Sequence, residues 1–251
     1  MSKALIITVA GTSSRFRKSL NQDVLKAIYC ENKMPTILDV ILEYAKDIFE
    51  EVIIVGGYKF DALSTYINKS CLRKKITLVE NKQFERGSNL SLILGIKSLE
   101  KEYDEVMFIE GDLLIDKESF LNIANNKENT ISYTNIPIDA KKSVAYYINK
   151  NNKIVYIYDT QHEYLKIEEP FKSIYNSGQI WKFCNIELLK KVANSFNEDH
   201  LDLTNLATIE SYFNQRKKIK HSLIKTWYNC NTIDDYQEAT QFLKEKNEYN
   251  K

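Results

Sequence analysis

A polar loop near the start of the chain carries groups that could bind phosphate. It follows the apolar, β-branched run Ala4–Val9, which predicts a buried strand. The loop consists of Ala10, Gly11, Thr12, Ser13, Ser14 and Arg15. Backbone N–H groups of small residues at a strand's carboxyl end can wrap a polyphosphate, and an arginine adds a planar fork of donors. The loop lacks the Walker and dinucleotide-binding glycine patterns, so an ordinary strand-to-helix turn is an equal alternative.

A second candidate for chemistry is the carboxylate of Asp112. It ends the segment Phe108–Asp112, which is predicted as a strand followed by an acidic turn. At that position a carboxylate would project over a cleft, where it could bind a magnesium ion that bridges nucleotide phosphates. The alternative is a cap or turn aspartate ahead of Leu113–Phe120.

The elements that position these groups alternate between strand and helix in the first half of the chain. Strands are predicted at Ala4–Val9, 51–55, 76–80 and 105–109, and helices at 36–47, 60–68 and from Ser88 or Asn89 onward. Strands and helices that alternate with short connections are typical of a parallel sheet covered on both faces. Ligands of such sheets bind outside the carboxyl ends of the strands.

The pattern changes after about residue 129. Alternating strands are predicted at 130–134, 144–148 and 154–158, the last two joined as a hairpin, and a polar turn between strands at Asn176–Gly178. Helices follow near 186–194 and 203–213, then a strand around 223–227 and a closing helix at 233–245. We expect one domain over residues 1–251, with a nucleotide-binding half (1–129) and an acceptor-binding half (130–251).

Composition excludes several classes of protein. The 251 residues include 35 Lys and Arg against 34 Asp and Glu, a net charge of +1, which argues against a nucleic-acid or polybasic membrane binder. No apolar run approaches the roughly 18 residues that cross a bilayer, and no secretion signal is recognisable. We therefore expect a cytoplasmic protein that does not insert into membranes. The scattered Cys30, Cys71, Cys184 and Cys230 argue against a disulfide framework or a cysteine-based metal site.

Several segments together resemble the nucleotidyltransferase signature of nucleotide-sugar pyrophosphorylases and their cytidylyltransferase relatives. That signature is usually Ala-Ala-Gly-x-Gly-Ser-Arg followed by Pro-Lys-Ala. The matching segments are Ile6–Phe16 with Lys26-Ala27, Pro35 and Leu38, then Val52–Tyr58, Asn81, Gly87–Leu92, Phe108–Asp112 and Trp227–Tyr236. Within that group the chain resembles bacterial cytidylyltransferases for phosphocholine, phosphonates and phosphoglutamine. The resemblance implies a single Rossmann-like, GT-A-like α/β domain with a mixed, mostly parallel sheet flanked by helices.

The resemblance also implies roles for individual residues. Arg15 and Lys26 would hold the triphosphate and Asp112 would hold Mg²⁺. The nucleotide would further contact the loop residues Ala10, Gly11, Thr12, Ser13 and Ser14 together with Asn81, Gly87, Ser88 and Asn89. The alternatives are a solvated surface lysine at position 26 and simple helix capping at 87–89.

Three positions depart from the family pattern. Ser13 occupies the second glycine, which would be strained if that position requires positive φ. Glu110 replaces the first acidic residue of an Asp-x-Asp pattern. Asn231 stands where many relatives have a second metal-binding aspartate, and an amide oxygen can coordinate a hard cation without adding negative charge. Asp234 and Asp235 are equally suited to the first turn of the last helix.

The expected reaction joins CMP from CTP to a small phosphorylated or phosphonylated metabolite, phosphocholine-like or phosphoglutamine, with release of pyrophosphate. It would serve capsule or surface-glycan decoration, and a homodimer is left open. The alternatives are a sugar-1-phosphate nucleotidyltransferase and an inactive nucleotide-binding subunit. Six aromatic residues could form a box for a quaternary ammonium or belong to the core: Tyr133, Tyr146, Tyr175, Trp181, Trp227 and Tyr228.

Overall fold

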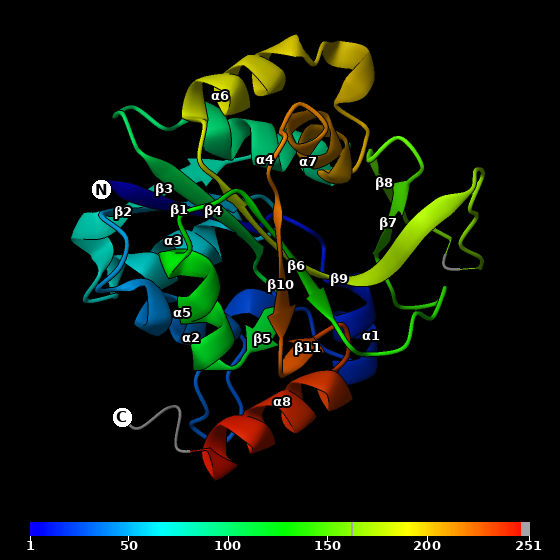
Figure 1. Cartoon of the computed structure of the whole chain (residues 1–251). Coiled ribbons are helices and arrows are strands. Elements are labelled where there is room, and N and C mark those ends of the chain that lie inside the picture. The colour runs from blue at the N-terminus through cyan, green and yellow to red at the C-terminus, as the bar shows by residue number, and fades with distance from the viewer. Residues whose placement is uncertain (162, 247–251) are drawn as a thin grey trace.

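The computed structural model describes residues 1–161 and 163–246. Four parallel strands form the first part of its central sheet, in the order β4-β1-β2-β3 (Figure 1). They are β1 (Lys3–Val9), β2 (Glu51–Gly56), β3 (Ile76–Glu80) and β4 (Glu105–Glu110). The central strands are nearly continuous apolar runs because helices cover both of their faces. All four carboxyl ends therefore lie at one edge of the sheet.

The second half of the chain extends the same sheet. Strand β9 (Phe171–Phe183) pairs antiparallel with β4, β6 (Thr130–Thr134) pairs antiparallel with β9, and β10 (Lys220–Ile224) pairs parallel with β6. The predicted polar turn at Asn176–Gly178 is wrong, because these residues lie inside β9. There Asn176 pairs with both Thr134 of β6 and Ala145 of β7. The first part of β9 pairs with β7, and its later part pairs with β6.

Two smaller strand pairs complete the sheet structure. The predicted hairpin is β7 (Ala145–Asn149) with β8 (Ile154–Ile157), and β7 also pairs with the first part of β9. Strands β5 (Leu113–Ile115) and β11 (Trp227–Asn229) form a separate antiparallel pair. The predicted strand at 223–227 is thus divided between β10 and β11, because the chain leaves β6 there to pair with β5.

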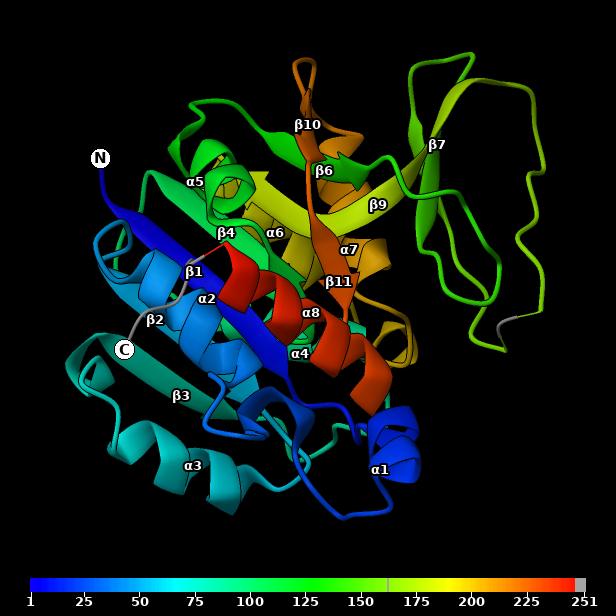
Figure 2. The ribbon, with the colours of Figure 1, turned by 90° about the horizontal axis from the view of Figure 1, so that it is seen from below.

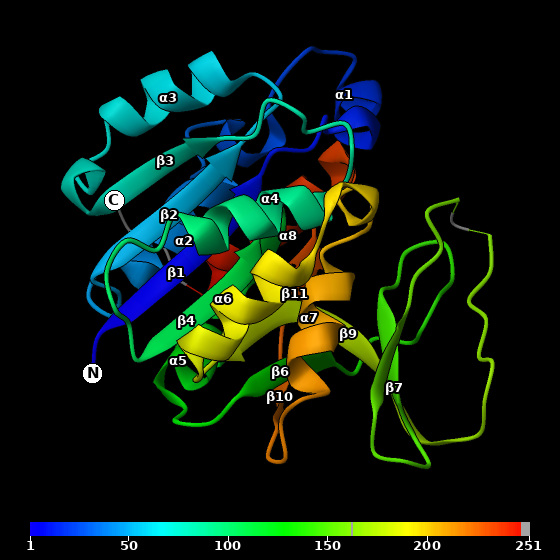
Figure 3. The same ribbon diagram turned by 90° about the horizontal axis from the view of Figure 1, so that it is seen from above.

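Helices cover both faces of the sheet. Figure 3 shows α4 (Ser88–Lys97), α6 (Ile186–Ser195) and α7 (Leu206–Phe213) on one face. Figure 2 shows α2 (Ile37–Ala45), α3 (Phe60–Asn68) and α8 (Ile233–Glu245) on the opposite face, which α5 (Lys117–Asn125) also covers. Helix α1 (Ser14–Leu20) follows the loop after β1. Short 3₁₀ turns occupy Lys26–Ile28, Arg73–Lys75 and Glu198–His200.

Strand β1 shows how the two hydrophobic cores are divided. Leu5, Ile7 and Val9 pack with α2, α5 and α8, whereas Ala4 and Ile6 pack with α4, α6 and α7. Side chains that alternate along a strand point to opposite faces, so one buried strand contributes to both cores. The expected α/β fold with a mostly parallel sheet is confirmed. Within the described residues no helix is both long and apolar enough to span a bilayer.

A buried ion pair crosses the junction between the two halves of the sheet. Lys182 of β9 has a side chain 1% exposed, and its Nζ lies 2.8 Å from Oε2 of Glu105 of β4. The ammonium also donates to the carbonyl of Ala124 at 3.0 Å, and Lys3 approaches the same Glu105 oxygen at 3.3 Å. Burial is the main reason that the pKa of Lys182 is lowered. The pair therefore ties β9 to the first residue of β4, at the end of the strand opposite to Glu110.

We predict that Lys182→Met lowers the free energy of unfolding by about 3 kcal/mol, because it leaves Glu105 buried with a weaker cation partner. Chemical denaturation measures this directly. Lys191→Met on the exposed side of α6 is the control and should stay within about 0.5 kcal/mol of the wild type. Equal stability of the two variants would show that the buried pair contributes nothing.

Candidate active site

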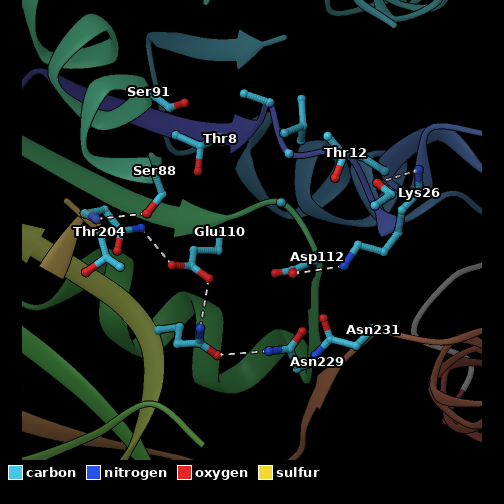
Figure 4. A pocket seen from close by; sticks show the side chains of 18 of the residues that line it. Thr8, Thr12, Lys26, Ser88, Ser91, Glu110, Asp112, Thr204, Asn229 and Asn231 are labelled. Atoms are coloured by element: carbon cyan, nitrogen blue, oxygen red, sulfur yellow. Dashed lines mark hydrogen bonds and ion pairs between the residues drawn. The ribbon is translucent and has the colours of Figure 1, made fainter. Parts of the chain in front are cut away.

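A cavity of about 380 Å³ lies at the carboxyl ends of β1 and β4 (Figure 4). The first half of the chain contributes the whole loop from Ala10 to Phe16, Leu25–Ala27, Gly87, Ser88, Ser91 and Glu110–Asp112. The second half contributes Lys142, Val144, Tyr158, Gln179, Thr204–Leu206, Asn229 and Asn231. This is the edge of the sheet at which the sequence predicts ligand binding, and both halves of the chain line it.

The loop after β1 presents open backbone to the cavity. A Cβ added to Gly11 would have no atom within 4 Å, so the space beside this backbone position is open. Ser13 has φ 53° and ψ 32°, a left-handed conformation, and its Oγ accepts a weak hydrogen bond of 3.4 Å from the Lys26 N–H. Ser13 therefore adopts a conformation that glycine takes more easily, at the position of the second glycine in the nucleotidyltransferase signature that this loop resembles.

Lys26 and Asp112 form an ion pair in the cavity wall. Nζ of Lys26 lies 3.0 Å from Oδ2 of Asp112, and the side chains are 11% and 24% exposed. The interpretation of Lys26 as a solvated surface lysine is therefore wrong. Asp112 is not a helix cap either, because Asp116 caps α5 through a 2.8 Å bond from the Ser119 N–H. Both charged side chains line the cavity.

Arg15 reaches across the cavity mouth to the C-terminal segment. Its Nη2 donates to Oδ1 of Asn231 at 3.0 Å. The two cations expected to bind phosphate and the acidic residue expected to bind metal thus surround one cavity. Asp235 instead forms a capping box with Thr232 at the start of α8, which confirms its interpretation as a first-turn residue.

Two buried oxygens in this wall have no hydrogen-bond partner among the described residues: Oδ1 of Asp112 and Oδ1 of Asn229. The segments that carry them are adjacent, since the Cys230 N–H donates to the Asp112 carbonyl at 2.9 Å. A magnesium ion takes oxygen ligands and is typically bound by one or two carboxylates plus phosphates and water. The donor set therefore fits Mg²⁺, although residues 1–161 and 163–246 contain no cluster of three His, Cys, Asp or Glu side chains.

Asn229 is a functional candidate that sequence reasoning missed. The prediction placed the amide ligand at Asn231, whose oxygen is already bonded to Arg15. Asn229 is the last residue of β11, two residues before Asn231. Side chains two residues apart along an extended segment lie on the same face, so this spacing could have indicated both positions. The metal roles of Asp112 and Asn231 stay predictions.

Glu110 is held by side-chain amides from the second half of the chain. Gln179 Nε2 donates to its Oε2 at 2.8 Å and Asn205 Nδ2 donates to its Oε1 at 2.7 Å. Asn229 Nδ2 in turn donates to Oε1 of Gln179 at 3.2 Å. Burial first, and then the neighbouring Asp112 carboxylate, raise the pKa of Glu110. This network of amides around a carboxylate was not visible in the sequence.

Of the predicted nucleotide contacts that follow the loop, Gly87, Ser88 and Ser91 line the cavity, whereas Asn81 and Asn89 do not. Asn81 is 1% exposed and donates to Ser91 Oγ at 3.0 Å. Asn89 is fully buried between the His200 carbonyl, to which it donates at 3.2 Å, and Thr208, which donates to it at 2.7 Å. Neither amide faces the cavity, so the structure places both behind its wall, where they support α4.

The aromatic residues do not form a box at the cavity. All six lie in the described part of the chain, and none of them lines the cavity wall. Trp181 is fully buried and stacks on Phe108 at a centroid distance of 5.2 Å. Tyr146 is also fully buried and packs against the rings of Tyr175 and His221. These rings pack with their neighbours, as the alternative interpretation predicts.

Residues 22–243 match a family model whose description is "Domain of unknown function (DUF6564)". The chain belongs to this family. Among curated proteins nothing matches this DUF6564 member.

Solved structures share the fold of this DUF6564 protein. The inositol-1-phosphate CTP transferase from T. maritima has a TM-score of 0.71 at 18% identity and covers 97% of both chains. A putative glucose-1-phosphate thymidylyltransferase from Bacillus anthracis has a TM-score of 0.69 at 17% identity, covering 96% of this chain and 95% of that one. The CTP:phosphocholine cytidylyltransferase from Streptococcus pneumoniae has 0.68 at 15%, covering 97% and 100%. The protein therefore has the nucleotidyltransferase fold.

We predict that Ser13→Gly raises the free energy of unfolding by about 1 kcal/mol, because glycine removes the left-handed strain. The melting temperature should rise by about 2 to 4 °C, measured by calorimetry. Ser14→Gly, one residue later inside α1, is the matched control and should lower stability. If both substitutions lower the melting temperature, Ser13 is not strained.

Proposed function

We propose that the protein transfers CMP from CTP to a small phosphorylated or phosphonylated metabolite and releases pyrophosphate. The observation that carries the proposal is the convergence of Arg15, Lys26 and Asp112 on one cavity at the carboxyl ends of a nucleotidyltransferase-type sheet. Two cations from one segment and a carboxylate from another suit a polyphosphate and its metal.

The proposed reaction requires only that the acceptor is positioned in line with the α-phosphorus and that the negative charge on the departing pyrophosphate is neutralised. An ionised phosphoryl oxygen of the acceptor forms a bond to the α-phosphorus of CTP, while the bond from that phosphorus to the bridging oxygen breaks. The electron pair of the broken bond leaves with pyrophosphate, so no general base is needed. Arg15 and Lys26 would grip the departing polyphosphate. A cation about 4 Å from a phosphate oxygen gains roughly 4 kcal/mol at an effective dielectric near 20.

Asp112 and Asn229 would hold Mg²⁺ through the two oxygens that have no partner among the described residues. When bound, the ion would supply positive charge against the nucleotide phosphates. The backbone of the loop from Gly11 to Ser14 would supply N–H donors to the same phosphates.

The choice of CTP is supported by the sequence resemblance and by the fold shared with two CTP-using enzymes. A sugar-1-phosphate nucleotidyltransferase is the second candidate, supported by the thymidylyltransferase of the same fold. Decoration of a capsule or surface glycan rests on the sequence resemblance alone. The cytoplasmic location and the homodimer stay predictions.

Pyrophosphate release tests the reaction. The purified protein is incubated in magnesium with each nucleoside triphosphate and a panel of phosphorylated, phosphonylated and sugar 1-phosphate acceptors. We expect release with CTP and a small non-sugar acceptor. Preference for UTP or dTTP with a hexose phosphate would support the second candidate instead. Tight nucleotide binding with no release for any pair would show an inactive nucleotide-binding subunit.

Lys26→Ala and Asp112→Ala should each lower turnover at least about tenfold, because each removes charge that acts on the reacting phosphates. Circular dichroism should show that both variants stay folded. Lys97→Ala, an exposed lysine of α4 away from the cavity, is the control and should keep wild-type turnover. A wild-type turnover rate in either cavity variant would show that the substituted residue does not contribute to catalysis.

Gly11→Ala tests the close approach of phosphate to the loop. The added methyl group has no protein atom within 4 Å and φ is not positive there, so the melting temperature should not change. The methyl group would, however, occupy space next to the amide, and the KM for the nucleotide should rise about tenfold or more. An unchanged KM would mean that the triphosphate does not contact Gly11.

A further inference from the structure

A chain of side-chain hydrogen bonds connects Glu110 with Asn229 along the cavity wall. Nε2 of Gln179 donates to Oε2 of Glu110 at 2.8 Å, and Nδ2 of Asn229 donates to Oε1 of Gln179 at 3.2 Å. The other oxygen of Glu110 accepts from Nδ2 of Asn205 at 2.7 Å. The chain ends at Oδ1 of Asn229, a buried oxygen without a hydrogen-bond partner in the part of the protein that the structure describes. Figure 4 shows this end of the chain near Asp112.

The direction of this chain is set by the carboxylate. An ionised carboxylate only accepts hydrogen bonds, whereas an amide side chain donates through its nitrogen and accepts through its oxygen. Gln179 must therefore direct its NH₂ group to Glu110, which leaves its oxygen facing Asn229. Asn229 must in turn direct its NH₂ group to Gln179, and its own oxygen is left for the cavity. A neutral side chain at position 110 would not impose this order.

Strand β9 places Gln179 in the cavity wall through a local irregularity. The register of β9 against β6 shifts between Ile131 and Tyr133 of β6. The hydroxyl of Ser132 replaces the missing strand contacts, because it accepts from the Ile180 N–H at 3.0 Å and donates to the Ile180 carbonyl at 2.8 Å. Gln179 itself has φ 56° and is 4% exposed. A bulge re-aims a side chain, and backbone strain persists where the surrounding contacts enforce it.

Strand β11 is joined to the same part of β9. Nε1 of Trp227, the first residue of β11, donates to the Gly178 carbonyl at 3.0 Å. Asn229, the last residue of β11, donates to Gln179, so both ends of this short strand are held against β9. Turning the Asn229 amide over would set its oxygen against the oxygen of Gln179 and would lose the bond between them. The unpaired oxygen of Asn229 therefore keeps one direction.

We propose that Glu110 is a positioning residue for a divalent cation, and that it acts through Gln179 by fixing the amide of Asn229 so that Oδ1 faces the ion. Asp112 supplies the charged ligand. This inference rests on the proposed function and adds two residues that do not touch the ion. An amide has a single oxygen to offer, so its orientation decides whether the cation is bound. Loss of a side chain that orients a metal ligand typically lowers metal affinity about 10- to 100-fold.

Metal binding tests the inference with a readout other than turnover. Mn²⁺ is titrated into the protein in the presence of a non-hydrolysable CTP analogue, and free Mn²⁺ is measured by electron paramagnetic resonance. Glu110→Gln should raise the Kd for Mn²⁺ at least about tenfold, because a neutral side chain no longer orders the amides. Glu118→Gln, the same change on an exposed residue of α5, should leave the Kd unchanged. An unchanged Kd in Glu110→Gln overturns the inference.

A substitution at position 229 distinguishes lost orientation from general damage to the cavity. In a protein with both Glu110→Gln and Asn229→Asp, the amide at 110 can donate to Gln179, and Gln179 can donate to the carboxylate at 229, which reverses the direction of the chain. Asn229→Asp should therefore improve Mn²⁺ affinity at least about tenfold more in the Glu110→Gln background than in the wild type. An equal effect of Asn229→Asp in both backgrounds overturns the inference.

Two further measurements leave no outcome undecided. If Glu110→Gln does not fold, the anomalous signal of Mn²⁺ in wild-type crystals decides: we expect the ion on Asp112 and Asn229, and an ion bound directly by Glu110 overturns the inference. Pyrophosphate release is measured in parallel. Release by the wild type together with an unchanged Kd in Glu110→Gln overturns this inference alone. A wild type that neither binds Mn²⁺ nor releases pyrophosphate with any acceptor overturns the proposed function as well.

Discussion

The contact between Lys26 and Asp112 is the interaction on which the site depends. The two residues are 86 positions apart, yet their side chains meet at 3.0 Å because the strands that precede them lie side by side. Thr8 of β1 pairs with Glu110 of β4, and the Gly111 N–H donates to the Thr8 carbonyl at 3.0 Å. A Cβ on Gly111 would lie 2.3 Å from Cγ1 of Val9, so only glycine allows this turn to pack so closely. Sheet register therefore sets the position of the acidic group.

The charges around the cavity are arranged in two regions. Arg15 and Lys26 lie with Asp112 beside the loop from Ala10 to Ser14, where the cations of the chain would face an anionic ligand. Glu110 lies on the side that the second half of the chain contributes, among amides that carry no charge. Amides at Asn229 and Asn231 would offer a metal ion less negative charge than a pair of carboxylates would. Phosphate oxygens of a bound nucleotide would then supply a larger share of the ligands of that ion.

Much of the first half could be predicted from sequence because its signals are local. Apolar runs such as Ala4–Val9 predict buried strands, and Thr36 forms the expected capping box with Asp39 at the start of α2. The resemblance to the nucleotidyltransferase signature singles out Lys26, and the place of Asp112 after a predicted strand singles out Asp112; the structure brings the two side chains together. Strand β9 was missed because its middle, Asn176–Gly178, has the composition of a turn and becomes a strand only through pairing with distant segments. Asn81 was predicted as a nucleotide contact but is buried and bonded to Ser91. The sequence does not distinguish an amide that faces a ligand from one that is buried behind the cavity wall.

The most direct test of the central claim is a crystal structure of the protein with magnesium and a non-hydrolysable analogue of CTP. The account predicts that the polyphosphate lies against the loop from Gly11 to Ser14, with Arg15 and Lys26 on its oxygens and the metal on Asp112. A nucleotide bound elsewhere, or one whose phosphates point away from Lys26 and Asp112, would contradict it.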